Sequence, residues 1–428
     1  MKMKKIDYPS VGETLYAGEL PNGLPIRVIP KPGFSSFYAV FGTNYGGAMR
    51  TFEVDGEKTD TPAGVAHFLE HKMFDLPNGD NALEMLSANG ADPNAFTSSG
   101  VTMYYFHCTE GFEDNLKLLL HFVSTPYFTP ETVAKEQGII GQEIRMTEDS
   151  PGNAIYYNLL SLLYANHPIK DKVAGTIESI AEITDKTLYD CHKVFYSPSN
   201  MVLCVEGDVD PERIYEIAEA ALPKEKASIP HADFGPAETC LPVQSENSVQ
   251  MAVSAPQFLI GAKVDQAPEG GKAELRNRLV ASLALRLLIG SSSHFYTSLY
   301  AEGILNRDFD SEIDYSAGTA TLLIGGESNS PSKVLGELNK AVSDVAANGF
   351  ADDYFLRAKK ANIGSQLRGL EDFDNVCVSV AMDLFDGFCT FDSIELLEGI
   401  TREDCEQWIA ANMAPERLAI SVVTPDNT

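Results

Sequence analysis

The chain has 428 residues, of which 44% are hydrophobic, and its 32 basic and 61 acidic residues give a formal net charge of −29. This length is enough for two domains of about 200 residues each. The charge argues against nucleic-acid binding, because the phosphate backbone requires a basic surface. No apolar run approaches the roughly 20 residues of a membrane helix, and the basic start lacks an apolar stretch behind it. We therefore expect neither a membrane span nor a secretory signal.

The first half of the sequence predicts alternating strands and helices. Residues 24–29 and 37–41 predict an opening hairpin, with turn signals at Pro32 and Gly33. A helix around 64–74, a helix over 81–88 and a strand over 101–107 follow in order. The next predicted elements are helices over 112–124, 130–147, 153–165 and 185–196, a strand over 201–206 and a helix over 211–222.

The second half is predicted to repeat this order after a linker. Residues 223–246 contain four prolines and a glycine and are the most linker-like segment of the chain. An apolar strand near 249–262 opens the second half, and the strand 417–423 closes it. The order of the elements indicates an α+β fold of two homologous domains, 1–222 and 247–428, each a mainly antiparallel sheet with helices packed on one face.

Cysteine usage indicates the compartment. The seven cysteines are scattered, odd in number and never in C-x-x-C spacing. This pattern is typical of reduced, mostly buried thiols, so we expect a cytoplasmic protein. The acidic excess could line an interior chamber and attract basic peptides, but a solvated acidic surface is the ordinary explanation.

The segment His67-Phe68-Leu69-Glu70-His71 places two histidines four residues apart with a glutamate between them. On a helix this spacing brings both imidazoles to one face, where they can bind one metal ion. Glu70 is better placed to reach a metal-bound water than to displace it. The order H-x-x-E-H is a zinc hydrolase signature. Two unrelated histidines on an ordinary helix are the alternative, which the apolar flanking residues disfavour because unpaired ionisable groups are costly to bury.

A catalytic zinc ion usually takes three protein ligands, so a third ligand is expected elsewhere. Residues 129–147 predict a helix, with Thr129 as N-cap and Pro130 at its first position. On this helix Glu136 and Glu143 are seven residues apart and share a face. One of them could bind the metal while the other fixes a ligand imidazole. For Glu136, a solvated acidic face is the ordinary alternative.

An internal repeat favours Glu143 as the third ligand. Residues 140–145 recur as 363–368, and the stretch that starts at Ile183 recurs from Ile400. In the second copy Gln366, a poor zinc ligand, takes the place of Glu143. The segment 294–298 stands where the segment His67 to His71 should repeat. It keeps the first histidine but has neither the glutamate nor the second histidine. Only the first copy is therefore equipped to bind metal.

Over nearly its whole length the chain resembles the pitrilysin/insulinase family of zinc metallopeptidases. The similar stretches are Gly64 to Phe74, Asn94 to Thr97, Thr102 to Phe106, the helix bearing Glu136 and Glu143, His167-Pro168 and Tyr196 to Met201. The run from Gly64 to Phe74 is most similar to the short two-domain branch found as paired genes in Gram-positive bacteria. In that branch an active member accompanies an inactive one.

The resemblance implies a zinc metalloendopeptidase with one Zn²⁺ per chain. His67, His71 and Glu143 would be the ligands, Glu70 the general base and Glu136 a supporting carboxylate. Asn94, Ala95 and Phe96 would lie on the strand that pairs with bound substrate. The two domains would close a clamshell chamber that admits peptides or unfolded segments and excludes folded proteins. Chains of this length in the family usually form a homodimer, or a heterodimer with an inactive homologue.

The second copy departs from the family pattern at one place. The inactive domain of the family commonly offers an arginine, followed some seven residues later by a tyrosine, and both hold the substrate. Here Tyr300 stands where the arginine is expected. Arg307 could substitute from a shifted position, or a partner chain could supply the group. Two other functions therefore stay open: a non-catalytic scaffold, and a maturation or accessory enzyme that needs an inactive partner chain.

Overall fold

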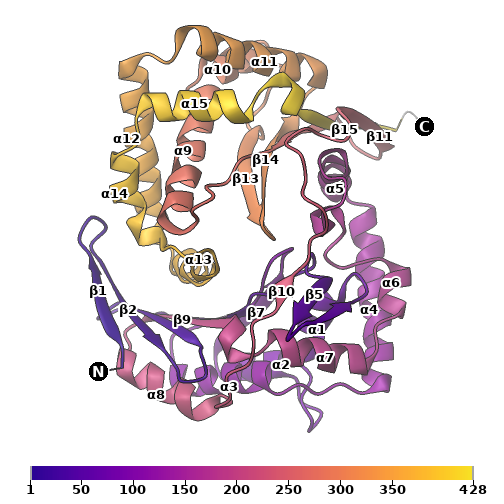
Figure 1. Cartoon of the computed structure of the whole chain (residues 1–428), viewed down its shortest axis with the longest axis vertical. Coiled ribbons are helices and arrows are strands. Elements are labelled where there is room, and N and C mark those ends of the chain that lie inside the picture. Colours follow the sequence, from indigo (N-terminus) through magenta and orange to yellow (C-terminus); the bar gives the residue numbers. More distant parts are fainter. Residues whose placement is uncertain (1, 427–428) are drawn as a thin grey trace. The chain divides into compact units, whose positions relative to one another are not determined.

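Two sheets organise the chain, and the computed structural model describes residues 2–426 (Figure 1). Unit 1 comprises the chain up to Ile144, Asp171–Phe234 and Arg368–Phe391, and unit 2 comprises Arg145–Lys170, Gly235–Leu367 and the chain from Asp392. Each unit combines a largely antiparallel sheet with helices, as the α+β prediction requires. Within residues 2–426, none of the helices has the length and apolar character that crossing a bilayer requires. The seven cysteines are free thiols.

The large sheet of unit 1 has the strand order β1-β2-β3-β9-β4-β8-β7. Its strands are Lys4–Tyr8 (β1), Glu13–Glu19 (β2), Pro25–Pro30 (β3), Phe37–Thr43 (β4), Ala91–Thr97 (β7), Thr102–Cys108 (β8) and Met201–Gly207 (β9). Only β3 and β9 are parallel neighbours. A small sheet joins Thr51–Val54 (β5), Glu57–Asp60 (β6) and His231–Ala232 (β10), which lies in the predicted linker.

The hairpin predicted from residues 24–29 and 37–41 is wrong. Both strands exist, but β9 lies between them, so that Leu203 is opposite Ile26 on one side and Phe41 on the other. Every residue of β9 is buried, and a strand without an exposed position is most stable in the centre of a sheet.

Helices cover one face of this sheet and form the main core of unit 1. They are Val65–Met73 (α1), Ala82–Ala88 (α2), Phe112–Ser124 (α3), Pro130–Glu148 (α4), Ile177–Ala181 (α6), Asp185–Phe195 (α7) and Pro211–Ala221 (α8). Phe68, Leu116 and Phe195 from three of these helices are fully or almost fully buried with Phe41 of β4. This apolar layer fixes the helix that carries the histidine pair against the sheet.

Unit 2 has a five-stranded sheet in the order β11-β15-β12-β14-β13. The strands are Glu246–Met251 (β11), Gln257–Lys263 (β12), Asp310–Ser316 (β13), Thr319–Glu327 (β14) and Ala419–Pro425 (β15), so the single strand predicted over 249–262 is two strands. The helices are Pro151–Leu163 (α5), Gly271–Ile289 (α9), His294–Ala301 (α10), Pro331–Asn348 (α11), Asp352–Gly369 (α12), Ser393–Glu398 (α14) and Arg402–Asn412 (α15). Short 3-10 turns lie at Pro168–Lys170 and Pro415–Arg417 in unit 2, at Pro198–Asn200 in unit 1, and at Thr390–Asp392, which spans the boundary between the units in the sequence.

The two sheets repeat one topology. The order β3-β9-β4-β8-β7 in unit 1 has the same sequence of connections as β11-β15-β12-β14-β13 in unit 2. In both sheets the first two strands of this series are parallel and the others are antiparallel. The fold is therefore a duplication, as the sequence repeat predicted.

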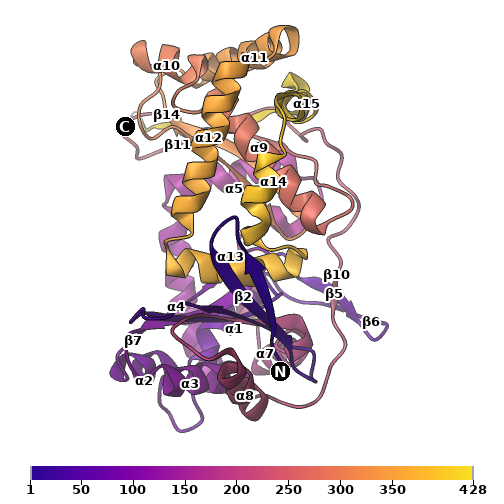
Figure 2. The same cartoon turned by 90° about the vertical axis from the view of Figure 1, so that its left-hand side faces the viewer.

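Each unit receives one helix from the other half of the sequence. Helix α5 packs on β12 and β15 of unit 2, and the Cβ of any larger residue at Gly261 would come 2.7 Å from Leu159 of α5. Helix α13 (Phe373–Asp386) packs on β9 and β4 of unit 1, and Figure 2 shows this helix lying along the large sheet. Val376 and Val380 of α13 are buried there with Val40 and Val202. The predicted boundaries, 1–222 and 247–428, follow the sequence repeat, whereas the compact units cross them at these two helices.

Candidate metal centre

Helix α1 begins after Gly64, whose backbone conformation is costly for any other residue. Gly64 has φ 96°, and a Cβ there would lie 2.6 Å from the carbonyl oxygen of Ala174. From this start, Val65, Phe68 and Leu69 are buried in the core. The opposite face of the helix is therefore left to His67 and His71, as their four-residue spacing predicts.

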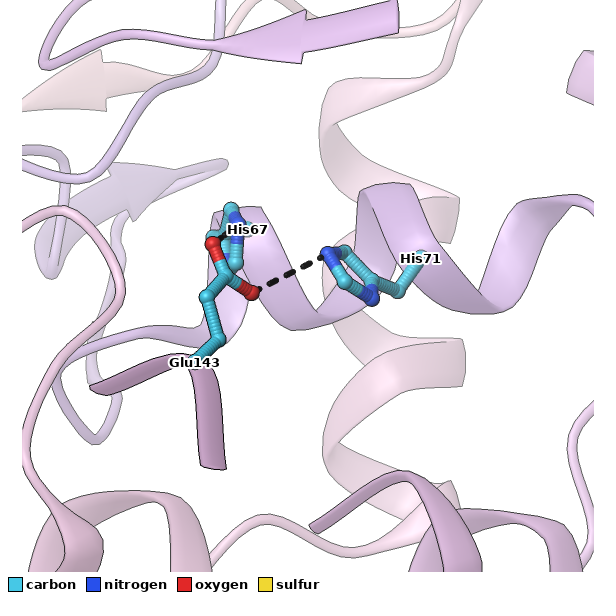
Figure 3. A group of neighbouring side chains, drawn as sticks. All are labelled: His67, His71 and Glu143. Carbon is cyan, nitrogen blue, oxygen red and sulfur yellow. Dashed lines mark ion pairs between the residues drawn. The ribbon is translucent and has the colours of Figure 1, made fainter. Parts of the chain in front are cut away.

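Both histidines face one carboxylate, which α4 supplies (Figure 3). The Nε2 atom of His67 lies 3.5 Å from Oε1 of Glu143, and Nε2 of His71 lies 3.6 Å from Oε2. One donor atom of each of the three residues lies within 4.8 Å of the other two. Among residues 2–426, no other group of three or more histidine, cysteine and acidic side chains is arranged so that it could hold a metal ion.

The donor set fits Zn²⁺. Two imidazole nitrogens and one carboxylate oxygen are typical of catalytic zinc sites. Donor atoms at about 2.0 to 2.2 Å from a tetrahedral ion are about 3.4 Å apart, close to the 3.5 and 3.6 Å between each imidazole and Glu143. Among the described residues, the Nδ1 atom of His67 has no hydrogen-bond partner, so the polar contact of this ring is made by Nε2.

Glu136 orients one of the two imidazoles. Nδ1–H of His71 donates to Oε1 of Glu136 at 3.0 Å, since a carboxylate can only accept. This bond leaves the lone pair of Nε2 directed toward Glu143 and the metal position. Burial lowers the pKa of His71, but the bond to Glu136 and the charges of Glu70, Glu136 and Glu143 outweigh it, so that the pKa is raised. The bond from His67 holds the pKa of Glu143 below its usual value despite partial burial.

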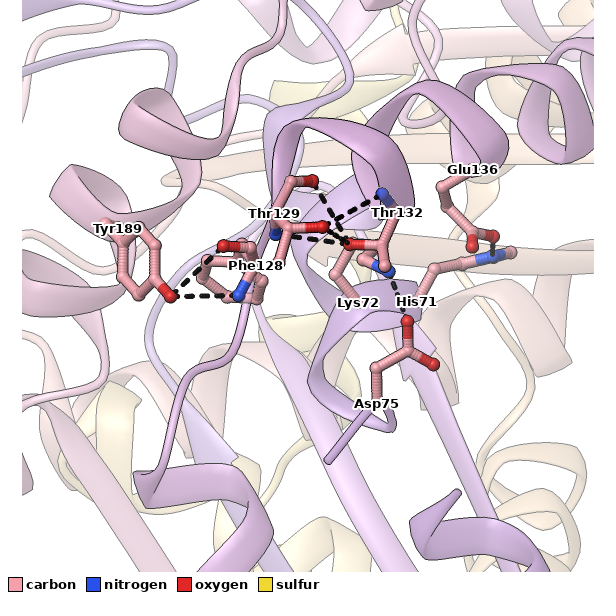
Figure 4. A network of polar contacts seen from close by, with 8 residues as sticks. All are labelled: His71, Lys72, Asp75, Phe128, Thr129, Thr132, Glu136 and Tyr189. Carbon is pink, nitrogen blue, oxygen red and sulfur yellow. Dashed lines mark hydrogen bonds and ion pairs between the residues drawn. The ribbon is translucent and has the colours of Figure 1, made fainter. Parts of the chain in front are cut away.

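The beginning of α4 is fixed by polar contacts (Figure 4). The backbone N–H of Thr132 donates to Oγ1 of Thr129 at 3.2 Å, which caps the helix as predicted. Just before Thr129, the backbone N–H of Phe128 donates to the hydroxyl of Tyr189 in α7 at 3.0 Å. The same hydroxyl donates to the backbone carbonyl of Phe128 at 3.2 Å. These contacts set where Glu136 and Glu143 lie along α4 relative to α1.

Glu70 is buried beside the histidine pair and is held by a residue of β7. Its side chain accepts a hydrogen bond from Oγ1 of Thr97 at 2.8 Å, on oxygen Oε2. Thr97 also contacts Oγ1 of Thr102 at 3.2 Å, and Thr102 donates to the carbonyl of Tyr45 at 2.9 Å. The sequence placed Thr97 in the stretch expected to pair with substrate but not beside Glu70, because only the strand alternation, which puts Thr97 on the face of Ala95, indicates its direction.

The residues expected to contact substrate fall in both units. Asn94, Ala95 and Phe96 lie on β7, the last strand of the large sheet. Tyr300 lies near the end of α10, is 44% exposed and stacks on Tyr296 at 5.6 Å. Arg307 is exposed in the loop before β13. Tyr300 and Arg307 belong to unit 2, and the substrate contact expected for all five residues stays a prediction.

Comparison with known proteins agrees with these features. The family model described as Insulinase (Peptidase family M16) matches residues 56–177, and the model described as Peptidase M16 inactive domain matches residues 182–362. A protein of Bacillus subtilis strain 168, named uncharacterized zinc protease YmfH, is 36% identical over 429 residues, with 99% of each chain covered.

Solved structures share the whole fold. The crystal structure of a putative M16-like peptidase from Alicyclobacillus acidocaldarius has a TM-score of 0.92 at 31% identity, covering 97% of this chain and 99% of that one. A protease from Helicobacter pylori has a TM-score of 0.82 at 18% identity, covering 96% and 99%, and supports the fold alone. The chain belongs to the insulinase family of zinc metallopeptidases, peptidase family M16.

Proposed function

We propose that the protein is a zinc-dependent endopeptidase that hydrolyses peptides or unfolded segments. The observation that carries this proposal is the convergence of His67, His71 and Glu143 on one point, with the carboxylate of Glu70 buried beside them. A buried carboxylate next to a metal position is the arrangement that general-base hydrolysis needs.

Each side chain has one task in this reaction. Zn²⁺, when bound by His67, His71 and Glu143, would polarise the substrate carbonyl and make a water nucleophilic at neutral pH. Glu70 accepts a proton from the attacking water and then delivers it to the leaving amine. Because Thr97 donates to one oxygen of Glu70 at 2.8 Å, the other oxygen remains for this proton.

Strand β7 supports an extended substrate. It pairs with β8 and, within the described chain, with no other strand, so its outer edge can receive a peptide as an added strand. Main-chain hydrogen bonds would supply most of the affinity, which implies little sequence selectivity and excludes segments that are already folded. Asn94, Ala95 and Phe96 are the residues along this edge.

Metal analysis and a quenched fluorescent peptide test the proposal on the full chain. We expect about one zinc per chain, and cleavage that falls by about 10²- to 10⁴-fold in Glu70→Gln while zinc is retained. His67→Gln should lose both zinc and cleavage. Cleavage that persists in Glu70→Gln would contradict the assigned base.

A second candidate is a subunit of a heterodimer with an inactive homologue, serving maturation of one peptide or a modification pathway. Tyr300, in the place where the resemblance predicts an arginine, favours this candidate. It predicts zinc without cleavage for the chain alone, and cleavage restored when the homologue is added. Light scattering with and without that homologue gives the oligomeric state. Absence of bound zinc would instead favour a non-catalytic scaffold.

A further inference from the structure

The carboxylate of Glu70 is held by a hydroxyl that has two possible acceptors. Oγ1 of Thr97 lies 2.8 Å from Oε2 of Glu70 and 3.2 Å from Oγ1 of Thr102. A threonine hydroxyl carries one hydrogen, so Thr97 donates to only one of these two oxygens at a time. A feature that makes Thr102 a poorer acceptor therefore strengthens the bond from Thr97 to Glu70.

The single hydrogen of the Thr102 hydroxyl points away from Thr97. Oγ1 of Thr102 lies 2.9 Å from the backbone carbonyl of Tyr45, and a carbonyl oxygen can only accept. Thr102 therefore donates to Tyr45 and offers only its lone pairs to other neighbours. Hydroxyl groups around Thr102, including that of Thr97, compete to donate to this oxygen.

Two buried tyrosines supply a competing donor. The hydroxyl oxygens of Tyr104 and Tyr196 lie 2.8 Å apart, and the hydroxyl of Tyr196 also forms a hydrogen bond with Thr102. Among residues 2–426, Tyr196 is the one hydrogen-bond partner of the Tyr104 hydroxyl, so Tyr104 donates to Tyr196. The hydrogen of Tyr196 is then left for Thr102. The hydroxyl of Tyr196 therefore occupies the oxygen that competes with Glu70 for the Thr97 hydrogen.

Packing and burial keep the Tyr196 hydroxyl in this role. Its ring stacks on His192 with 4.7 Å between the ring centres, and Nε2–H of His192 donates to the carbonyl of Val123 at 3.0 Å. Burial raises the pKa of Tyr104 and of Tyr196 above the ordinary value, and the charge of Glu70 adds to this effect. Both hydroxyls therefore keep their hydrogens at neutral and mildly alkaline pH.

We propose that Tyr196 is a positioning residue for Glu70. Its hydroxyl donates to Thr102, so that Thr97 keeps its own hydrogen for the carboxylate of Glu70. The effect is largest after Glu70 has accepted a proton, because a neutral carboxyl group attracts the Thr97 hydrogen less strongly than a carboxylate does. The inference rests on the proposed function in taking Glu70 as the base.

Two tyrosine variants that each remove one hydroxyl test this role. Tyr196→Phe and Tyr104→Phe break the same bond between the two rings, but only Tyr196→Phe removes the donor to Thr102. We expect Tyr196→Phe to lower kcat for a quenched fluorescent peptide by about three- to tenfold, with KM and zinc content unchanged. Tyr104→Phe is the matched control, and its kcat should stay within about twofold of the wild-type value. Circular dichroism checks that both variants are folded. Equal losses of kcat in the two variants would overturn the proposal, because they would reflect the packing of the tyrosine pair.

A second substitution separates positioning from stability. Thr102→Val replaces the competing hydroxyl by a methyl group, so that Glu70 is the remaining acceptor for Thr97. Added to Tyr196→Phe, this substitution should restore kcat to within about twofold of the wild type, although the double variant lacks further buried hydrogen bonds. A merely structural role for Tyr196 predicts the opposite, a further loss. A double variant with a kcat at or below that of Tyr196→Phe would refute the competition for the Thr97 hydrogen.

Crystal structures of the variants give a readout that does not depend on cleavage. We expect Tyr104→Phe to retain the contact between Thr97 and Glu70 that is present in the wild type. In Tyr196→Phe this contact should lengthen beyond about 3.5 Å, or Glu70 should occupy a second rotamer. An unchanged contact and a single rotamer in Tyr196→Phe would overturn the proposal. If the contact shifts as expected but the wild type cleaves no peptide, the peptidase alone is refuted. If the wild type and Tyr196→Phe cleave equally fast, the positioning role alone is refuted.

Discussion

Replacing Glu206 by glutamine should make the protein more stable at alkaline pH. Glu206 lies in β9, and its side chain is fully buried. Neither carboxylate oxygen has a hydrogen-bond partner among the described residues, and the nearest cation, Lys31, lies 3.4 Å away and is bonded to Glu13 at 2.6 Å. Burial raises the pKa of Glu206 from its ordinary 4.5 to about 8, although Lys31 acts in the opposite direction. The folded protein therefore holds a proton here that the unfolded chain releases.

The sign and size of the effect follow from this pKa. Between pH 4.5 and about 8 the folded state binds more protons at Glu206 than the unfolded state does. The stability that the Glu206 carboxyl contributes to the folded state is therefore complete below pH 4.5 and is lost as the pH rises through 8. One pKa unit corresponds to about 1.4 kcal/mol, so the free energy of unfolding should fall by about 3.5 kcal/mol from pH 5 to pH 8 through this group. Glutamine does not titrate and removes this loss.

Urea unfolding of the wild type and Glu206→Gln from pH 5 to pH 8 measures the effect. Burial lowers the pKa of His192 to about 4, so this group gives the opposite slope and loses stability as the pH falls below 6.5. Because both proteins contain His192, its contribution cancels in the difference between them. That difference should grow by about 3.5 kcal/mol from pH 5 to pH 8, while the exposed control Glu225→Gln stays flat. Parallel curves for the wild type and Glu206→Gln would refute the reasoning.

Three substitutions test the supports of the candidate metal centre. Thr97→Val should lower kcat by about tenfold or more at unchanged zinc content, because Glu70 loses its orienting bond, while Thr97→Ser retains activity; a Val variant with wild-type kcat would contradict this role. Glu136→Gln should weaken zinc affinity by about 10- to 100-fold in a chelator titration, and an unchanged affinity would show that His71 needs no support. Gly64→Ala should cost about 1–3 kcal/mol in urea unfolding because of its φ and the contact with Ala174. Gly138→Ala, with no atom within 4 Å of the added Cβ, should cost nothing.

Local chemistry made much of the fold and of the site predictable. Helix α4 begins after Thr129, whose hydroxyl accepts a hydrogen bond from the backbone N–H of Thr132, and this cap was predicted from the sequence. The spacing of His67 and His71 along one helix, and of Glu136 and Glu143 along another, is fixed by helix geometry. The remaining step, which brings these two helices together, came from the resemblance and the repeat.

Contacts between distant segments could not be predicted from the sequence. The hairpin of β3 and β4 satisfied every local rule, yet β9 lies between them because a wholly buried strand is stable only with neighbours on both sides. The bond from Thr97 to Glu70 joins a strand to a helix, and no spacing rule relates the two positions. Likewise, the repeat gave the number of copies but not the partner of each helix.

The placement of α5 and α13 makes the two halves of the gene product dependent on each other. A chain cut in the 223–246 segment would give two fragments, each with one sheet face bare and one apolar helix without its sheet. Neither fragment should fold alone, whereas the two expressed together should recombine into one protein. The second half carries no zinc ligand, but its helix α13 covers one face of the sheet that supports the metal centre. We therefore expect that the second half cannot be removed or replaced by an unrelated domain.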